Sequence, residues 1–428
     1  MIRCHVRPNL RVLRDLRGEK VFSLTIRVPE EFAQAAKTLK QYRVRRDLSF
    51  QTLPSATSAP PRCKLRVLLL VVAVFLFAAI GYSAESQDEW KKTVEAAKKE
   101  AKIVAGGPPT AVLRKQFKET FEQKFGIEME LVSAPGPQNA GKAASEFKAG
   151  VRYFDVLHGG SGTLEPLMNE NMLAPFAEYM ILPEVKDPRQ WWGGHIWEDN
   201  VKNNRFIYSF SADFSAPPFF NADLLKPGEI NSYDDLLSPK WKGKIGLFEP
   251  RIPSAGQGLW GFLMKIKGKE FLQKLAQQDL FISRDGQQLA VGLAKGTLVI
   301  ALGLSQRFVD PYIKANLPIK ALNTIKEGTS GSNGFGTVAV MRNAPHPNAA
   351  KVYVNWLLSK EGQELYSLAL TQGTRRLDVE TKWLARFNTP AAKDITTPEE
   401  YEKVRFYGED IITEWREPAG EFARKILK

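Results

Sequence analysis

The stretch KIVAGGPPTAVLRKQFKETFEQKFGIEMELV, residues 102–132, decides the fold class. It opens with an apolar run that stops at a Gly-Gly-Pro-Pro turn, which is typical of a short strand and its end. A helix is predicted from about Thr110 to Phe125, and Gly126 stands where a left-handed cap favours glycine. Residues 127–132 then alternate like a second strand. This order predicts a βαβ unit of a parallel sheet.

The same pattern returns further along the chain. A strand over Phe154–Leu157 is followed by the turn HGGSGT, residues 158–163, and by a helix from about Leu164 to Met172. More strands are predicted over residues 245–248, 298–303 and 319–322. Because helical patterns separate these strands, the sequence predicts an α/β protein, long enough for two domains of ordinary size.

Five stretches, taken in order, resemble the extracellular solute-binding proteins of ABC importers, in the type II periplasmic-binding class and the branch that includes ferric-iron binders. They are Val104–Phe125, Phe154–Leu173, Ser232–Ile245, Asn343–Gln363 and Gly373–Val379. The most specific is SYDDLLSPKWKGKI, residues 232–245, and the likeness covers about residues 90–390.

The resemblance implies an α/β fold of two lobes, the type II periplasmic-binding-protein fold with hinge crossover strands and a ligand cleft. Lobe 1 would comprise residues 85–212 and 337–428, and lobe 2 residues 220–330. The extended segments 208–221 and 334–341 would form the hinge crossings. Proteins of this kind close around their ligand by hinge motion.

Residues 64–84 have the layout of a secretory signal peptide. Lys64 and Arg66 precede the apolar run VLLLVVAVFLFAAI, and small residues follow before Glu85. We therefore expect export to the periplasm. An uncleaved membrane anchor stays open as the alternative, because residues 67–84 are 18 residues without a charge.

Residues 1–63 form an Arg-rich extension in front of this signal, and we expect little fixed structure in it. One hypothesis is that translation starts further downstream and that this segment is an artefact of the assigned start. Residues 1–66 hold 15 Lys or Arg against 5 Asp or Glu, and so account for most of the net charge of +13. This distribution argues against nucleic acid as a partner of the whole chain. Both cysteines, Cys4 and Cys63, also lie here, so the exported part can form no disulfide and no thiolate site.

Glycine-rich turns are the first candidates for ligand contact. Gly160, Ser161, Gly162 and Thr163 lie between a strand and a helix start, where unpaired backbone N–H groups favour anions. Gly107 offers the same chemistry after an earlier strand. The alternative is a plain tight turn with Thr163 as the helix cap.

Arginines are the second group of candidates. Arg375 and Arg376 could clamp a carboxylate or phosphate through paired hydrogen bonds, and the resemblance puts their loop at the cleft. A solvated turn, or an arginine paired with Asp378, is the alternative. Arg307 follows a predicted strand at the place where ferric binders of the resembled branch carry a tyrosine pair, and its alternative is a solvent-facing side chain. A cation there disfavours iron and favours a small anion.

Hydroxyl groups near the predicted crossings complete the set. Ser211 lies on the first crossing and Ser330 precedes the second, so both could donate to a ligand or belong to ordinary loops. The histidines lack metal-ligand spacing, and no nucleophile or P-loop motif is present, so we expect no metal site, no cofactor and no catalysis.

The sequence thus favours a monomeric periplasmic protein that captures a small, anionic solute and delivers it to an ABC permease. A ferric-ion binder is the first rival. An exported enzyme on the same fold is the second, because fold alone does not fix function. A membrane-anchored sensor would follow if the apolar run is retained.

N-terminal sequencing of the protein recovered from the periplasm tests the export signal. We expect the mature chain to begin at Ala84, because Gly81 and Ser83 are small enough for a cut after Ser83; a cut after Ala84 suits less well, since Tyr82 is bulky for its position. A mature product that retains residues 67–80 would contradict cleavage and support the anchor.

Overall fold

The computed structural model describes residues 9–14, 20–25, 86–160, 162–201, 205–387 and 389–427. The chain divides into two units, Met1–Phe75 and Leu76–Lys428. The predicted signal peptide, residues 64–84, lies outside the described residues. Within the part that is described, no helix combines the length and the apolar character needed to span a membrane.

The first unit contains a hairpin. Strand β1 (Asn9–Arg14) pairs antiparallel with β2 (Lys20–Thr25), with Asn9 opposite Thr25. This differs from our expectation of little fixed structure over residues 1–63. The pattern behind it is two runs with Val, Leu and Phe on either side of a short charged connection that contains glycine, which is a hairpin signal.

The second unit begins with a sheet of six strands in the order β4-β3-β5-β15-β7-β6. The strands are β3 (Lys102–Gly107), β4 (Glu128–Ser133), β5 (Val156–Gly159), β6 (Ile196–Trp197), β7 (Tyr208–Ser209) and β15 (Thr337–Val340). Strands β3 and β4 are parallel, with Lys102 opposite Glu128 and Gly107 opposite Ser133, which confirms the predicted βαβ unit. Strand β15 runs antiparallel to both β5 and β7.

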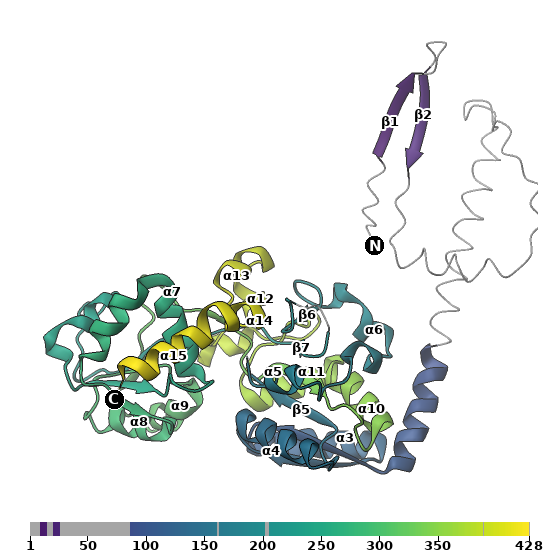
Figure 1. The fold of residues 1–428 in the computed structure, drawn as a ribbon, viewed down its shortest axis with the longest axis horizontal. Helices are drawn as coiled ribbons and strands as arrows, with labels where there is room; N and C mark the ends of the chain where they lie inside the picture. Colours follow the sequence, from purple (N-terminus) through teal and green to yellow (C-terminus); the bar gives the residue numbers. More distant parts are fainter. Residues whose placement is uncertain are drawn as a thin grey trace, which may run out of the picture. The chain divides into compact units, whose positions relative to one another are not determined.

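Helices cover this sheet and define lobe 1 (Figure 1). They comprise a helix over residues 86–100, η2 (Leu113–Phe117), α3 (Lys118–Phe125), α4 (Gly136–Lys148), α5 (Glu165–Asn169), η3 (Phe176–Tyr179), α6 (Pro183–Lys186), η4 (Pro188–Gln190), α10 (Pro347–Leu357) and α11 (Lys360–Leu370). Gly126 ends α3 with φ 67°, as the sequence predicts. Aromatic side chains of η2, α3 and α10 pack against one another in the core, with the Phe117 and Trp356 ring centroids 4.5 Å apart.

A sheet of five strands, in the order β11-β10-β12-β9-β13, builds lobe 2. The strands are β9 (Phe219–Asn221), β10 (Ile245–Phe248), β11 (Phe281–Ser283), β12 (Ile300–Leu302) and β13 (Ile319–Ala321). Its helices are η5 (Tyr233–Leu237), η6 (Pro239–Trp241), α7 (Ala255–Ala276), α8 (Gly286–Ala294) and α9 (Gln306–Lys314). Strand β10 is parallel to β11 and β12, so the carboxyl ends of all three meet at one edge.

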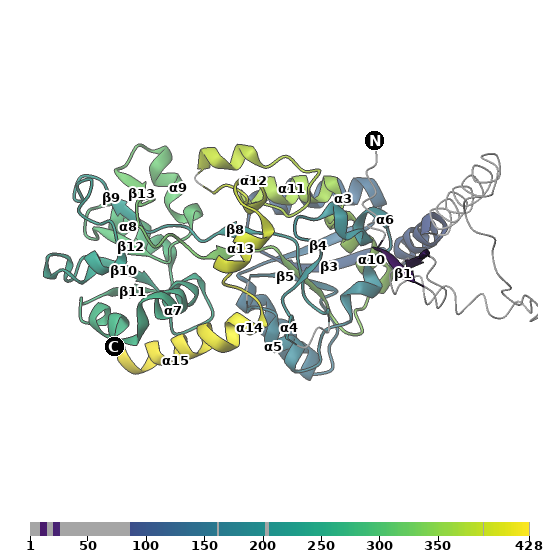
Figure 2. The same cartoon turned by 90° about the horizontal axis from the view of Figure 1, so that it is seen from above.

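Two strands link the lobes. Strand β8 (Asp213–Phe214) pairs antiparallel with β14 (Gly331–Ser332) and lies between the two sheets (Figure 2). Residues 208–221, which we predicted as the first crossing, contain β7, β8 and β9. The second crossing lies earlier in the chain than the predicted residues 334–341. Strand β14 makes this crossing, and β15 already belongs to the lobe 1 sheet.

The C-terminal segment corrects the predicted lobe boundary. After η7 (Lys382–Phe387), α12 (Ala392–Ile395) and α13 (Pro398–Val404), the Phe406 amide donates to the Gly331 carbonyl oxygen at the crossing, 3.1 Å away. The chain then forms α14 (Glu409–Ile411), η8 (Ile412–Arg416) and α15 (Glu417–Ile426), and α15 packs along α7 of lobe 2. Ala419 and Ala423 join the lobe 2 core, since small side chains let the two helices approach closely. Assigning this last segment to lobe 1 was therefore wrong.

The crossing contains a buried carboxyl group. Asp213 is 7% exposed, and its oxygens accept hydrogen bonds from the Ser211 hydroxyl, at 2.8 Å, and from the Gly373 amide, at 2.8 Å. Burial raises the pKa of the Asp213 carboxyl to about 6, although these two hydrogen bonds act in the opposite direction. The protonated form is thus favoured in the folded protein well above the usual pKa of an aspartate.

An Ala423→Asp substitution tests the packing of α15 on lobe 2. It would place a carboxylate among the apolar side chains of the lobe 2 core, and we expect about 3–5 kcal/mol of lost stability in urea unfolding. Glu421→Ala, on the exposed side of α15, is the control and should leave the midpoint within about 0.5 kcal/mol. Equal, small effects of both variants would contradict the packing.

The Asp213 carboxyl predicts a pH dependence of stability. Because its pKa is raised on folding from its usual 3.8 to about 6, the folded protein holds a proton that the unfolded chain releases between those values. This contribution is present at low pH and is lost as pH rises through about 6, by about 2–3 kcal/mol. Asp213→Asn keeps the shape and removes the titration, so the stability difference, parent minus variant, should fall between pH 4 and pH 6. A constant difference across that range would refute the assignment.

Candidate functional site

Each sheet has one edge at which its parallel strands end. In both lobes this carboxyl edge faces the crossing. In lobe 1, β5 ends at Gly159 and β7 at Ser209, and both pair with Thr337 of β15. The chain runs directly from Ser209 through β8 to Phe219, which pairs with Ala301 of β12 in lobe 2. Loops at the carboxyl ends of strands are where α/β proteins bind ligands. The crossing thus sets the loops of both lobes on either side of one region.

On the lobe 1 side lies the glycine loop predicted from the sequence. The Thr163 amide donates to the Gly160 carbonyl oxygen at 3.0 Å and closes the turn, and Gly162 has φ 76°. A Cβ at Gly160 would lie 2.7 Å from the Gly334 carbonyl oxygen, so the loop touches the segment that leads out of β14. Ser161 lies outside the described residues. The helix after the loop starts with Leu164, and not Thr163, at its N-cap.

Gly107 has a different setting. It is the last residue of β3 and is buried, and its carbonyl oxygen accepts from the Ala134 amide at 3.1 Å. The Asn139 side-chain amide donates to the same oxygen at 3.4 Å. Gly107 therefore holds the β3–β4 edge together, and its carbonyl group is occupied by the protein.

On the lobe 2 side, two helices begin next to each other. The Ser254 hydroxyl accepts a hydrogen bond from the Gln257 amide at 3.0 Å and so caps α7, whose first residue, Ala255, is exposed. Gly303, which follows β12 with φ 69°, lies so near that its Cβ would be 3.0 Å from Gly256. The start of α7 and the loop leading into α9 are thus in contact. Helix N-termini carry unpaired N–H groups and partial positive charge.

Arg307, in the first turn of α9, is the predicted site residue that reaches between the lobes. Its guanidinium carbon lies 4.8 Å from the centroid of the Phe308 ring and 4.9 Å from that of Phe335, which belongs to lobe 1. Among the residues that the structure describes, no carboxylate or carbonyl oxygen pairs with this guanidinium. The residue is exposed overall, yet the crowding around its guanidinium lowers the Arg307 pKa, and arginine stays charged.

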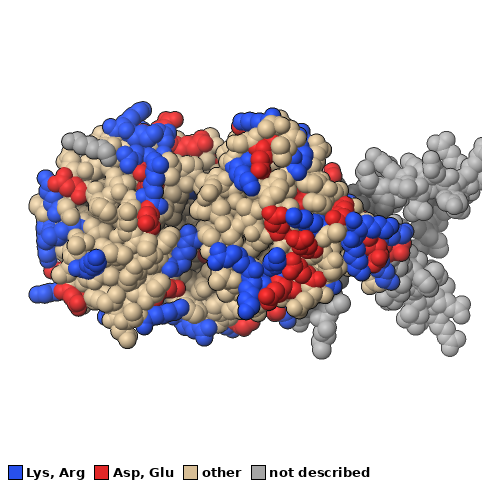
Figure 3. All heavy atoms as spheres, turned by 90° about the horizontal axis from the view of Figure 1, so that it is seen from below, with Lys and Arg blue, Asp and Glu red and all other residues tan. Residues whose placement is uncertain are grey.

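Two further arginines lie on the same edge, and our sequence interpretation missed them. Arg251 follows β10 and Arg284 follows β11, and both approach the Glu249 carboxylate, at 2.7 and 3.7 Å. With Arg307 after β12, each parallel strand of lobe 2 leads to an arginine, a spacing that could have been found in the sequence. The three arginines are partly balanced by two acids, Glu249 and the N-cap residue Asp285. These loops therefore carry a net charge of one positive unit. Elsewhere both signs of charge are mixed, as Figure 3 shows for one face.

Arg375 has a structural role that the sequence did not reveal. It is fully buried at 0% exposure, and its Nη1 donates to the Ser209 carbonyl oxygen at 2.8 Å. Its Nη2 donates to the carbonyl oxygens of Trp192, at 2.6 Å, and Gly194, at 2.5 Å. Burial lowers the Arg375 pKa. With these hydrogen bonds formed, the guanidinium ties three backbone segments together and offers no clamp to a ligand.

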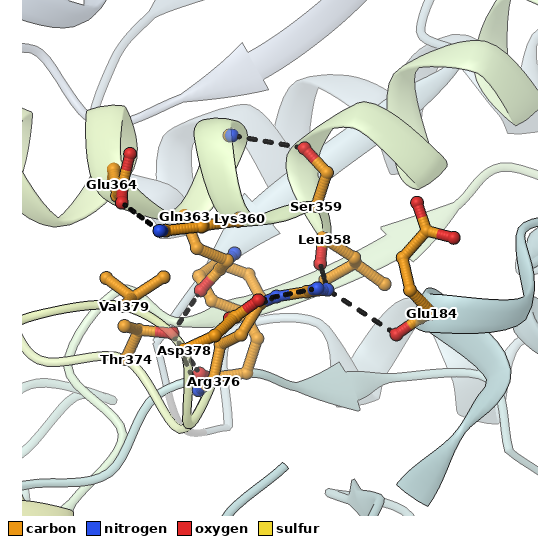
Figure 4. Close-up of polar contacts among 12 residues, drawn as sticks. Glu184, Leu358, Ser359, Lys360, Gln363, Glu364, Thr374, Arg376, Asp378 and Val379 are labelled. Carbon is orange, nitrogen blue, oxygen red and sulfur yellow. Dashed lines mark hydrogen bonds and ion pairs between the residues drawn. The ribbon is translucent and has the colours of Figure 1, made fainter. Parts of the chain in front are cut away.

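Arg376 is anchored in the same way. It is 3% exposed, its Nη1 donates to the Leu358 carbonyl oxygen at 2.6 Å, and its Nε lies 2.7 Å from the Asp378 carboxylate (Figure 4). The same Nη1 reaches the Glu184 carbonyl oxygen at 3.5 Å. The pairing with Asp378 that the sequence left open is therefore the one observed, and the loop after α11 is fixed by both arginines.

The two predicted serines also belong to the crossing. The Ser211 hydroxyl lies 2.8 Å from the Asp213 carboxylate and 2.6 Å from the Gly373 carbonyl oxygen. The Ser330 hydroxyl lies 2.9 Å from that of Ser215, so it ties the second crossing to the first. Both serines are buried and engaged with the protein.

The described residues contain no group of three or more His, Cys, Asp or Glu side chains arranged to hold a metal ion. Tyr208 and Tyr353 are buried in lobe 1, and burial raises their pKa values above the usual range, which disfavours phenolate. His158 precedes the glycine loop but points into the core, where its Nε2 lies 2.6 Å from the Tyr353 hydroxyl. Burial lowers the pKa of His158 to about 3, so the ring is neutral.

Comparisons with known proteins agree with this arrangement. Residues 116–388 match the model of a family described as bacterial extracellular solute-binding proteins. The chain is 24% identical over 218 residues to Iron uptake protein A1 of Synechocystis, a match that covers 47% of this chain and 53% of that protein. The chain thus spans about half the length of this curated relative.

Solved structures give the fold. Iron-bound HitA from Pseudomonas aeruginosa superposes with a TM-score of 0.56 at 17% identity, over 76% of this chain and 99% of the other. The periplasmic binding protein AfuA from Actinobacillus pleuropneumoniae, with fructose-6-phosphate bound, gives 0.54 at 19% identity, over 76% and 98%. At these identities the likeness establishes the two-lobed fold alone. Because the family match spans more than half of the chain, the protein belongs to the bacterial extracellular solute-binding proteins.

Proposed function

We propose that this solute-binding protein captures a small anion between its lobes. The observation that carries the proposal is the Arg307 guanidinium, which lies between the lobes without a carboxylate partner among the described residues. An exposed guanidinium with no carboxylate partner keeps its N–H donors available to a bound anion. A solute with a carboxylate or phosphate group would supply that charge.

The neighbouring groups suit the same chemistry. The planar fork of N–H donors on Arg307 can form two parallel hydrogen bonds with a carboxylate or phosphate. The start of α7, at Ser254 and Ala255, adds the partial positive charge of a helix N-terminus next to the loop that leads to Arg307; this helix runs unbroken up to the kink at Gly268. From lobe 1, the loop that holds Gly160, Gly162 and Thr163 would bring backbone groups within reach, because glycine allows a ligand close to the chain. Arg375, Arg376, Ser211, Ser330 and Gly107 are left out of the proposed contacts, since their polar groups serve the fold.

Relatives support an anion without deciding its identity. The AfuA structure contains fructose-6-phosphate, a phosphate monoester, and it shares the fold of this chain. We further propose that residues 64–84 direct export to the periplasm, and that the closed, monomeric protein delivers its solute to an ABC permease. Differential affinity of the solute for the closed form would drive closure.

Ferric ion is the second candidate. Iron-bound HitA and Iron uptake protein A1 are both similar to this chain, and that similarity is the observation in its favour. Against it, Gln306 and Arg307 occupy the start of α9, and a cation at that place repels a metal ion unless an anion accompanies it. The family consists of binding proteins, so turnover of a bound compound would be needed to revive the enzyme alternative.

Two measurements test the proposed function. Native mass spectrometry of protein recovered from the periplasm should reveal a small co-purified anion. Calorimetry with inorganic phosphate, citrate and fructose-6-phosphate as probes should detect binding that Arg307→Ala weakens about 10- to 100-fold, since a charge-assisted hydrogen-bond pair is lost.

Arg386→Ala is the matched control. Arg386 is also an exposed arginine, 4.8 Å from the Phe387 ring, but it lies on η7 outside the proposed site, so binding should be unchanged. Equal affinities of the parent and Arg307→Ala for every anion bound would contradict the proposal. Visible colour on adding ferric ion, with no anion bound in its absence, would favour iron.

A further inference from the structure

A short loop in lobe 1 presents one aromatic side chain to Arg307. The loop is Gly334-Phe335-Gly336, between β14 and β15. The Phe335 amide donates to the Gln372 side-chain oxygen at 2.8 Å, and the Phe335 carbonyl oxygen accepts from the Tyr366 hydroxyl at 2.9 Å. Both partners are buried side chains of lobe 1. The backbone of Phe335 is therefore fixed on both sides.

The two glycines are required at their positions. A Cβ at Gly334 would lie 2.4 Å from the Gln372 side chain, and one at Gly336 would lie 2.1 Å from Ser211. Neither position has room for a side chain. Phe335 is thus the only side chain that this loop can offer, and its ring lies 4.9 Å from the Arg307 guanidinium carbon.

Lobe 2 holds a second ring against the same guanidinium. The Phe308 centroid is 4.8 Å from the Arg307 guanidinium carbon, and the ring packs so closely on Gly286 that a Cβ there would lie 2.5 Å away. Phe248, at the end of β10, lies beside it with ring centroids 6.4 Å apart. Phe308 is therefore held in place by the starts of α8 and α9, and one ring from each lobe contacts Arg307.

We propose that Phe335 is a positioning residue for the solute: with Phe308 it engages the Arg307 guanidinium from across the lobes, leaves the N–H edge free for an anion, and so couples capture to closure. This rests on the proposed function, in which Arg307 contacts the solute. A guanidinium can lie over aromatic rings while its in-plane N–H groups bind an oxyanion.

Coupling follows from the location of the two rings. Phe308 belongs to the same helix as Arg307, so its contact does not depend on how the lobes are arranged. Phe335 belongs to lobe 1, so its contact exists only while the lobes are brought together. An anion that binds Arg307 in one orientation therefore favours the closed arrangement, in which Phe335 holds the guanidinium in that orientation. By linkage, the closed arrangement binds the anion more tightly.

The test compares two replacements of Phe335, measured by calorimetry with inorganic phosphate. Phe335→Leu keeps apolar bulk but removes the ring, and we expect about fivefold weaker binding. Phe335→Tyr keeps the ring and should bind within about twofold of the parent. In the Arg307→Ala background, Phe335→Leu should have no further effect, since the two residues act through one contact.

A control and a second readout separate positioning from packing. Phe387→Leu removes the ring beside Arg386, also 4.8 Å away, and should leave phosphate binding unchanged. Small-angle X-ray scattering of phosphate-saturated protein should show Phe335→Leu to be more open than the parent and than Phe335→Tyr. These results together would support the coupling.

The outcomes distinguish the inference from the function on which it rests. If Arg307→Ala loses phosphate binding while Phe335→Leu binds like the parent, Phe335 has no positioning role and the inference is overturned alone. Equal losses for Phe335→Leu and Phe335→Tyr would also overturn it, because a ring would not matter. If Arg307→Ala binds phosphate like the parent, the proposed function itself fails.

Discussion

The crossing of the chain between two sheets is the constraint on which the site depends. Strand β8 leaves the carboxyl edge of the lobe 1 sheet and leads into β9, which joins the lobe 2 sheet beside β12, so loops of both lobes face one region. Buried polar groups maintain the crossing, above all Asp213 with the Ser211 hydroxyl and the Gly373 amide. A short, hydrogen-bonded link of this kind can bend without unpacking either core, which is what hinge closure requires.

Burial divides the arginines into two kinds. Arg375 and Arg376 are buried in lobe 1. Their guanidinium groups donate hydrogen bonds to backbone carbonyl oxygens and, for Arg376, to the Asp378 carboxylate. Arg307 contacts two rings and keeps its in-plane donors available. The same residue type thus stabilises a loop in one place and can recognise a charge in another, and the difference lies in what surrounds each guanidinium.

Local pattern was sufficient for most of the fold. The Gly126 cap and the parallel pair β3–β4 both follow from short stretches of sequence. The path of the C-terminal segment could not be predicted in this way. Its small residues pack against α7, a helix of lobe 2 that is distant in the sequence. The role of Arg375 was equally hidden, since its acceptors at Trp192, Gly194 and Ser209 are distant in sequence. Site residues defined by such long-range contacts need the structure.

The most direct test of anion capture between the lobes is a crystal structure of the protein with the solute that co-purifies from the periplasm. It should show an oxyanion within hydrogen-bonding distance of the Arg307 guanidinium, enclosed by the Gly160–Thr163 loop and the start of α7. A metal ion bound by oxygen ligands without an anion, or a solute bound away from Arg307, would contradict it.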